Sequence, residues 1–149
     1  MPRILAVDWG ERRIGLAICD PTGTIASGLE TLVVRSASEG PPRVAAVAAE
    51  LEADSIVVGL PLRLSGERGS AAQAAERFAE QLREASRLPV HLYDERLTSA
   101  LSQRRMQALG ERPSRRKGRI DQGAAIALLE SWMARLEAER RRAAAGEEP

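Results

Sequence analysis

The chain has 149 residues, of which 44% are hydrophobic and 29% charged, a balance typical of a globular protein with room for one domain. No apolar run approaches the roughly 20 residues of a membrane-spanning helix, and Met1-Pro2-Arg3 leads into a predicted strand rather than a signal peptide. The single cysteine, Cys19, excludes a disulfide framework and a cysteine-rich zinc site. We therefore expect a cytoplasmic protein without a membrane partner.

The predicted elements begin with a meander of three strands and then alternate between helices and strands. Strands are expected at residues 4–7 (closed by Asp8), 14–19, 24–34, 55–59 and 89–93, and helices at 43–53, 70–86, 98–110 and 120–142. The runs at 4–7 and 55–59 lack polar alternation, which indicates strands that are buried on both faces.

This order predicts one domain over residues 1–142, with a disordered tail at 143–149. Its expected architecture is α/β, a mixed five-stranded sheet flanked by helices, in which the fourth strand lies beside the first. The Ser70-Ala71-Ala72-Gln73 stretch has the form of a capping box and opens the helix at 70–86.

Three carboxylates are candidates for one site. Asp8 closes the first strand and Glu95 follows the fifth, and ligands of such sheets gather at the carboxyl ends of the central strands. Asp121 belongs to the last helix, at helical spacing from an apolar stripe that must pack on the sheet. The other members of that stripe are Ala124, Ala125, Leu128 and Trp132.

Each acid also has a purely structural interpretation. Asp8 can pair with Arg12 or Arg13, Glu95 can bond to Arg96, and a helix-start acid such as Asp121 is favoured by the macrodipole. The structural interpretation weakens when the three are taken together, because independent acids rarely point to the same spot.

Three carboxylates without histidine or cysteine form a hard-oxygen site, which suits Mg²⁺ or Mn²⁺ rather than zinc. The only histidine, His91, lies inside a predicted strand and is interpreted as structural. A carboxylate site with a pair of metal ions is common machinery for hydrolysing phosphodiester bonds. We therefore expect two divalent ions held by Asp8, Glu95 and Asp121.

Arginines occur near these acids in the sequence. They are most frequent in a predicted basic loop that ends at Gly118. A charge run is most often a solvated surface, but this one leads directly into Asp121, which suits recognition of a phosphate backbone. Aromatic residues make up only 3% of the chain, so base stacking has little support. The candidate nucleic-acid-binding residues are Arg12, Arg13, Arg63, Arg96, Arg104, Arg105, Arg112, Arg115, Arg116, Lys117 and Arg119.

Four motifs in order give the chain a resemblance to a known family. They are Asp8-Trp9-Gly10 with Ile14-Gly15, Val57-Val58-Gly59-Leu60-Pro61-Leu62 with Gly66, Asp94-Glu95-Arg96-Leu97-Thr98-Ser99, and Lys117-Gly118-Arg119-Ile120-Asp121. Over residues 3–133 the sequence resembles the YqgF (RuvX) family, to which Holliday junction resolution and 5′-end trimming of pre-16S ribosomal RNA have been attributed. The resemblance implies a ribonuclease H-like fold and a divalent-metal nuclease whose acidic triad falls on Asp8, Glu95 and Asp121.

Several functions compete at this point. A metal-dependent nuclease acting on structured RNA or branched DNA is favoured, with ribosomal RNA preferred on the family description alone. A phosphotransferase is also conceivable because Asp-x-Gly turns occur in actin-like kinases, but these need two such domains. A non-catalytic nucleic-acid-binding module is the third option, disfavoured because all three acids are present. Either a monomer or a homodimer is compatible with the sequence.

Overall fold

The computed structural model describes residues 3–60, 69–94 and 113–146, and for residues 113–121 the helical backbone alone. Its strands are β1 (Ile4–Asp8), β2 (Arg13–Cys19), β3 (Ala26–Val33), β4 (Ser55–Leu60) and β5 (Val90–Asp94). Its helices are the short 3₁₀ helix η1 (Ala37–Glu39) and the α-helices α1 (Gly40–Glu50), α2 (Ser70–Ser86) and α4 (Pro113–Ala144). No helix in this part of the chain combines the length and the apolar character needed to span a bilayer.

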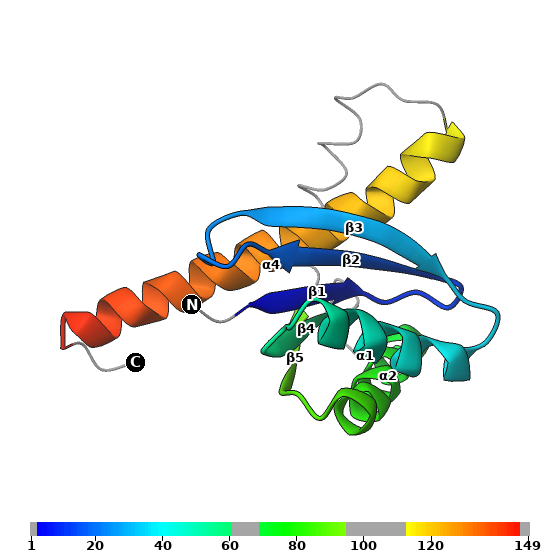
Figure 1. The fold of residues 1–149 in the computed structure, drawn as a ribbon, viewed down its shortest axis with the longest axis horizontal. Coiled ribbons are helices and arrows are strands. Elements are labelled where there is room, and N and C mark those ends of the chain that lie inside the picture. The colour runs from blue at the N-terminus through cyan, green and yellow to red at the C-terminus, as the bar shows by residue number, and fades with distance from the viewer. Residues whose placement is uncertain (1–2, 61–68, 95–112, 147–149) are drawn as a thin grey trace.

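The five strands form one mixed sheet in the order β3-β2-β1-β4-β5 (Figure 1). β1 and β3 are both antiparallel to β2, whereas β1, β4 and β5 are parallel to one another. This arrangement confirms the predicted α/β architecture, including the fourth strand beside the first. It also places the carboxyl ends of β1, β3, β4 and β5 at the same end of the sheet.

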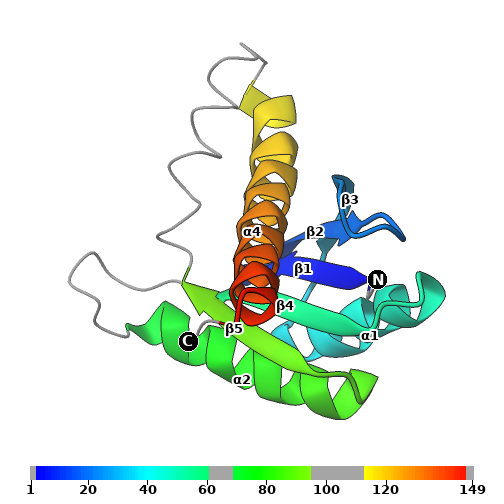
Figure 2. The same cartoon turned by 90° about the vertical axis from the view of Figure 1, so that its left-hand side faces the viewer.

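The two faces of the sheet are covered by different helices, with α1 and α2 on one side and α4 on the other (Figure 2). Along β1 the side chains alternate between these layers. Leu5 and Val7 belong to the core under α1 and α2, whereas Ile4 and Ala6 belong to the core under α4. The uninterrupted apolar run of β1 follows from this burial on both faces.

A row of small residues lets α4 approach the sheet closely. Ala6, Ala17 and Gly28 are register partners across β1, β2 and β3. A Cβ atom on Gly28 would lie 3.2 Å from Cδ1 of Ile126 and 3.4 Å from Cβ of Gln122, so a larger side chain would require these neighbours to shift. The helix is therefore seated directly on this row.

The start of α1 and the N-cap of α2 differ from the sequence predictions. α1 begins at Gly40 rather than at residue 43, because the prolines of its first turn have no amide hydrogen to lose there and fit the helical φ. α2 begins as predicted near Ser70, but its N-cap is Gly69 and no side chain caps it, so the capping box is wrong. Ala72 and Ala75 are buried on its inner side, whereas Ala74 is half-buried.

The start of α4 is the largest correction. The basic segment before Ile120 was predicted to be a loop, yet the helix already begins at Pro113. A proline is well suited to the first turn of a helix, and the arginines that follow are good helix formers. The helix continues to Ala144, and the disordered tail at 143–149 stays a prediction. The helix predicted at 98–110 lies outside the described residues.

Candidate active site

Asp8 is the last residue of β1, the central strand of the sheet, and its side chain is half-buried. It is the register partner of Gly15 on β2. Because Ala6 faces α4 and successive side chains alternate, Asp8 also belongs to the face that α4 covers. A carboxylate at this place loses part of its hydration, so its conformation and partners are constrained by the fold.

The turn after Asp8 is close-packed at Gly10. A Cβ atom on Gly10 would lie 2.5 Å from the backbone oxygen of Arg13. Any residue other than glycine would therefore clash with this oxygen. Trp9 lies on the other side of the strand, where it packs against the ring of Phe78 with 6.4 Å between the centroids. Asp8 therefore lies on the face of the sheet that α4 covers, whereas Trp9 packs in the layer of α1 and α2.

Asp121 lies in the described backbone of α4, directly before Gln122, whose Cβ would lie 3.4 Å from a Cβ atom on Gly28 of β3. One turn further on, Ala125 begins a buried stripe with Leu128 and Trp132, which packs over the central strands. This stripe confirms the predicted orientation of α4. Position 121 continues it at a spacing of four residues.

Glu95, the third predicted acid, lies outside the described residues, directly after the last residue of β5, Asp94. Tyr93 belongs to the core under α4, so strand alternation places Asp94 on the opposite face. Asp94 therefore lies on the face of the sheet away from the candidate site.

The predicted nucleic-acid-binding residues fall into three groups. Arg12 lies in the turn between β1 and β2 and Arg13 begins β2, both at the same end of the sheet as Asp8, with Arg12 exposed and Arg13 half-buried. Four others lie in the first turns of α4, where only the backbone is described: Arg115, Arg116, Lys117 and Arg119. The rest lie outside the described residues: Arg63, Arg96, Arg104, Arg105 and Arg112.

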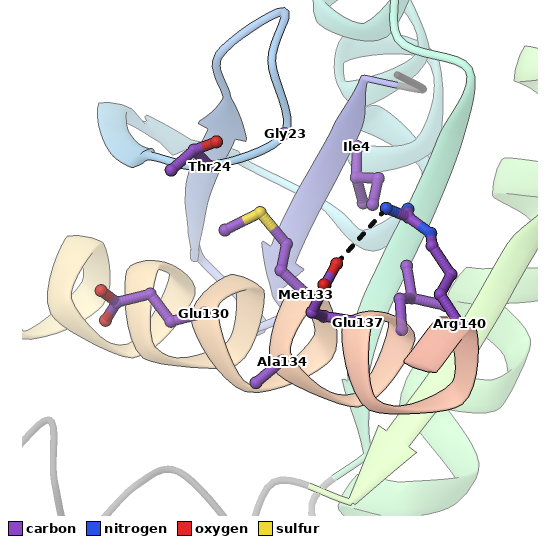
Figure 3. Close-up of a pocket in the computed structure, with 9 residues that line it drawn as sticks. Ile4, Gly23, Thr24, Glu130, Met133, Ala134, Glu137 and Arg140 are labelled. Atoms are coloured by element: carbon purple, nitrogen blue, oxygen red, sulfur yellow. Dashed lines mark ion pairs between the residues drawn. The ribbon is translucent and has the colours of Figure 1, made fainter. Parts of the chain in front are cut away.

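A pocket of about 520 Å³ lies at the opposite end of the sheet from Asp8. Ile4, at the start of β1, lines it together with Met133 of α4 and Thr24 of the β2–β3 turn (Figure 3). An exposed ion pair between Glu137 and Arg140, with 3.6 Å between its nitrogen and oxygen atoms, closes one side. This pocket contains none of the predicted acids, so we do not assign the candidate chemistry to it.

Within the described residues no group of three or more histidine, cysteine, aspartate or glutamate side chains is arranged to hold a metal ion. That observation leaves the predicted triad untested, because only Asp8 of its three side chains is described. Sequence reasoning also missed two arginines near this end of the sheet, Arg35 and Arg43, since each is isolated in the sequence and no motif contains it.

Solved structures of nucleic-acid resolvases share this fold. Thermus thermophilus RuvC in complex with a Holliday junction substrate matches with a TM-score of 0.59 and 17% identity, over 92% of this chain and 97% of that one. The fowlpox virus resolvase in complex with Holliday junction DNA matches with a TM-score of 0.56 and 16% identity, over 90% and 98% of the two chains. The protein therefore has the ribonuclease H-like fold of the resolvases.

The family is established by sequence. The model of the RuvX family, described as Holliday junction resolvase, matches residues 2–135, and the chain belongs to this family. A relative from Synechococcus sp. is 41% identical over 129 residues, covering 87% of each chain. One from Mycobacterium tuberculosis is 44% identical over 132 residues, covering 88% of this chain and 78% of the relative. Both relatives carry the name "Putative pre-16S rRNA nuclease".

Proposed function

We propose that the protein is a divalent-metal-dependent nuclease that hydrolyses phosphodiester bonds in the 5′-end processing of pre-16S ribosomal RNA. The observation that carries the proposal is the position of Asp8, a half-buried carboxylate at the carboxyl end of the central strand, on the face covered by α4. The names of the relatives with more than 40% identity supply the substrate class.

The donor set fits a hard divalent cation. Asp8, Glu95 and Asp121 offer carboxylate oxygens, the ligands that Mg²⁺ and Mn²⁺ prefer, and the sole histidine is committed elsewhere. His91 is exposed on β5, with its ring 5.2 Å from that of Trp132. When bound, the ions would supply activation of the attacking water and stabilisation of the leaving oxygen.

The chain's own residues would bind and orient the substrate. Arg12 in the short β1–β2 turn and Arg13 at the start of β2 lie only a few residues from Asp8, so a phosphate group bound to their guanidinium groups would lie near the carboxylate. The basic first turns of α4 lead toward position 121 from the other side. Contacts of this kind fix the position of a nucleic-acid backbone without reading its sequence.

Resolution of Holliday junctions is the second candidate, favoured by the description of the family model. A resolvase would act on branched DNA and would need two active sites related by a two-fold axis to cut both strands symmetrically. Trimming one RNA end needs only one site. The two functions therefore differ in both substrate and assembly.

Cleavage of two substrates tests the proposal. A labelled pre-16S RNA fragment containing the 5′ processing site and a four-way DNA junction are each incubated with the protein in Mg²⁺, Mn²⁺ or EDTA. The variants are Asp8→Asn and a matched control, Asp94→Asn, which removes a charge at the same end of the sheet on the opposite face. We expect metal-dependent cutting of the RNA by the wild type and by Asp94→Asn, and loss of cutting in Asp8→Asn.

Other outcomes would identify the alternatives. Preferential cutting of the DNA junction would favour the resolvase. Binding of both substrates without any cleavage would make the protein a nucleic-acid-binding module. Equal cleavage by the wild type and the Asp8→Asn protein would remove Asp8 from the chemistry.

A further inference from the structure

A group of arginines gathers where β3 ends, beside the candidate active site. The amide nitrogen of Val34 donates a hydrogen bond to the backbone oxygen of Arg12, with 2.8 Å between the two atoms, so the residues after β3 adjoin the β1–β2 turn. β3 runs in the same direction as β1, and its last residue therefore lies at the same end of the sheet as Asp8. Arg35 follows at once, and Arg43 lies one turn into α1.

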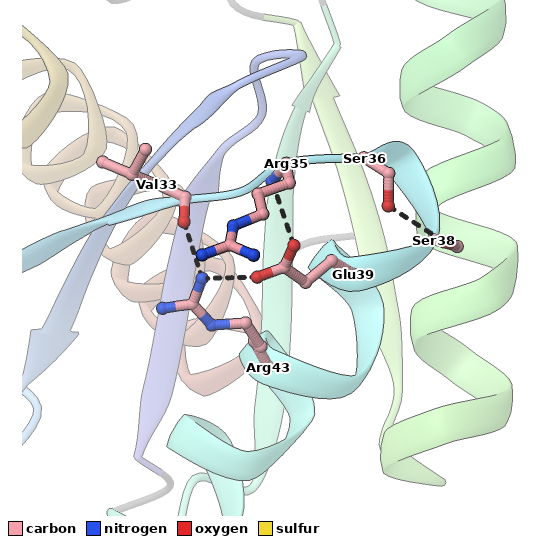
Figure 4. A network of polar contacts seen from close by, with 6 residues as sticks. All are labelled: Val33, Arg35, Ser36, Ser38, Glu39 and Arg43. Carbon is pink, nitrogen blue, oxygen red and sulfur yellow. Dashed lines mark hydrogen bonds and ion pairs between the residues drawn. The ribbon is translucent and has the colours of Figure 1, made fainter.

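Glu39 connects Arg35 and Arg43 (Figure 4). Its Oε2 accepts a hydrogen bond from the backbone nitrogen of Arg35 at 3.0 Å, and its Oε1 accepts one from Nη1 of Arg43 at 3.1 Å. The same Nη1 of Arg43 donates to the backbone oxygen of Val33 at 2.6 Å. The Arg35 amide, followed by Arg43, lowers the pKa of the Glu39 carboxyl below its usual value, so Glu39 stays ionised and keeps Arg43 oriented.

The positive charge of the group exceeds the negative charge that faces it. One carboxylate, Glu39, forms an ion pair with the guanidinium group of Arg43 and accepts only the backbone amide of Arg35, and Figure 4 shows the two guanidinium groups next to each other. Arg35 and Arg12 are exposed, and no described carboxylate forms an ion pair with either guanidinium. Their donors therefore remain available to an anion from solution.

We propose that Arg35 and Arg43, together with Arg12, bind the phosphate backbone of the nucleic acid at a distance from the bond that is cut. This inference rests on the proposed function and deepens it, since it adds Arg35 and Arg43, which none of the sequence motifs contains, to the predicted Arg12. Arg43 is oriented by Glu39 and Val33, whereas Arg35 and Arg12 present free donors, so the region combines a fixed guanidinium with two adaptable ones.

The spacing of the strands sets the reach of this contact. β1 and β3 are separated by β2, which corresponds to about 10 Å at the usual strand spacing. Phosphates of one strand of double-stranded DNA follow one another at about 3.4 Å along the axis, which sets the order of magnitude for a structured RNA. The backbone bound at Arg35 therefore lies roughly three nucleotides from the scissile bond, and the substrate must extend at least that far.

Binding measurements test the proposal. The affinity for the labelled pre-16S RNA fragment is measured by fluorescence anisotropy at several salt concentrations, in an Asp8→Asn background so that the RNA stays intact. Arg35→Gln is expected to raise Kd about eightfold at 0.1 M salt and to reduce the slope of log K against log salt by about 0.9, the effect of one lost phosphate contact in a duplex. Arg35→Lys keeps the charge and is expected to keep the slope.

The matched control is Arg142→Gln, which removes the same charge from an exposed arginine in the last turn of α4, far from Asp8. It is expected to leave the slope unchanged.

A second arm uses RNA shortened from either end of the processing site. With fewer than about three nucleotides remaining on the side that reaches Arg35, the wild type and Arg35→Gln should bind equally.

The outcomes separate this inference from the proposed function. If the wild type cleaves RNA but Arg35→Gln binds with unchanged affinity and slope, the arginine group is not a contact region although the function stands. The same conclusion follows if Arg142→Gln weakens binding as much as Arg35→Gln does. If nothing is cleaved and Arg35→Gln still weakens binding selectively, the contact region stands and the nuclease does not.

Discussion

The phenol oxygen of Tyr93 lies 2.8 Å from the hydroxyl oxygen of Ser131, so the edge strand β5 is hydrogen-bonded to α4 through two side chains. The ring of Trp132 packs edge-on against that of Tyr93, with 5.4 Å between the centroids. β5 leads into Glu95, and α4 contains Asp121. This contact therefore joins the two elements that bear two of the three predicted acids.

Removing either hydroxyl should weaken that connection. Tyr93→Phe and Ser131→Ala are each expected to lower the free energy of unfolding by about 1 kcal/mol, the net value of a typical hydrogen bond. The double variant should lose less than the sum, with a coupling energy of about 0.5–1.5 kcal/mol. Urea unfolding of the wild type, the two single variants and the double variant gives the coupling energy. Strictly additive losses of unfolding free energy would show that the two hydroxyls do not interact.

Binding of a divalent ion should be visible without any cleavage. At a concentration 100 times its Kd, Mn²⁺ stabilises a protein that binds it only in the folded state by about 2.7 kcal/mol. For a chain of this length that corresponds to roughly 5–10 °C in Tm. We expect this rise in the wild type and in Asp94→Asn, and a much smaller one in Asp8→Asn. An equal rise in all three would place the ion elsewhere.

The packing of α4 on the sheet predicts a large effect at Leu128, which is 1% exposed. Leu128→Ala leaves a cavity between α4 and the central strands and should lower the free energy of unfolding by about 2–5 kcal/mol. Ile25→Ala is the matched control, because Ile25 is 61% exposed, and its change should be about 0.5 kcal/mol or less. Comparable losses at both positions in chemical denaturation would contradict this account of the core.

The turn between β2 and β3 gives a pH dependence with a defined sign. Backbone hydrogen bonds from Ile25, then the Thr22 hydroxyl and the Thr24 amide, lower the pKa of Asp20 from 3.8 to about 2. A carboxyl with a lowered pKa stabilises the fold above its unfolded pKa and loses that contribution as the pH falls through the folded value. Asp20→Ala should therefore have a lower Tm than the wild type at pH 7.

The same Tm difference should shrink between about pH 4 and pH 2 and vanish below that range. Melting curves of both proteins across this interval measure it. A difference in Tm that stays constant down to pH 2 would show that the ionised carboxylate is not what stabilises the turn.

The parts of the fold that follow from local pattern were predictable. The apolar run Ile4–Val7 indicated a central strand because burial on both faces leaves no place for polar side chains. The stripe through Ala125, Leu128 and Trp132 indicated which side of α4 meets the sheet, since helical spacing repeats over three turns. Asp8 was identified by its position at the end of that strand.

The remaining features depend on contacts between distant residues. The row of small residues Ala6, Ala17 and Gly28 is formed by the register of three strands. No short stretch of the sequence contains all three residues. Arg35 and Arg43 likewise come together with Arg12 only in the folded sheet. The early start of α4 was missed because glycine and basic charge were taken as loop signals, although a proline opening a run of arginines also favours a helix.

The 32 residues of α4 form one continuous helix, in which position 121 precedes Trp132 by eleven residues, or about 16 Å along the axis. The core contacts of Trp132 and Leu128 thus set the rotation of the whole helix, including the turn that carries the third acid. Each added residue rotates a helix by about 100°. One alanine inserted between Gln122 and Gly123 would leave these core contacts in place while turning position 121 away from the sheet. The number of residues between position 121 and the core contacts of α4 is therefore as much a requirement of the site as the acid itself.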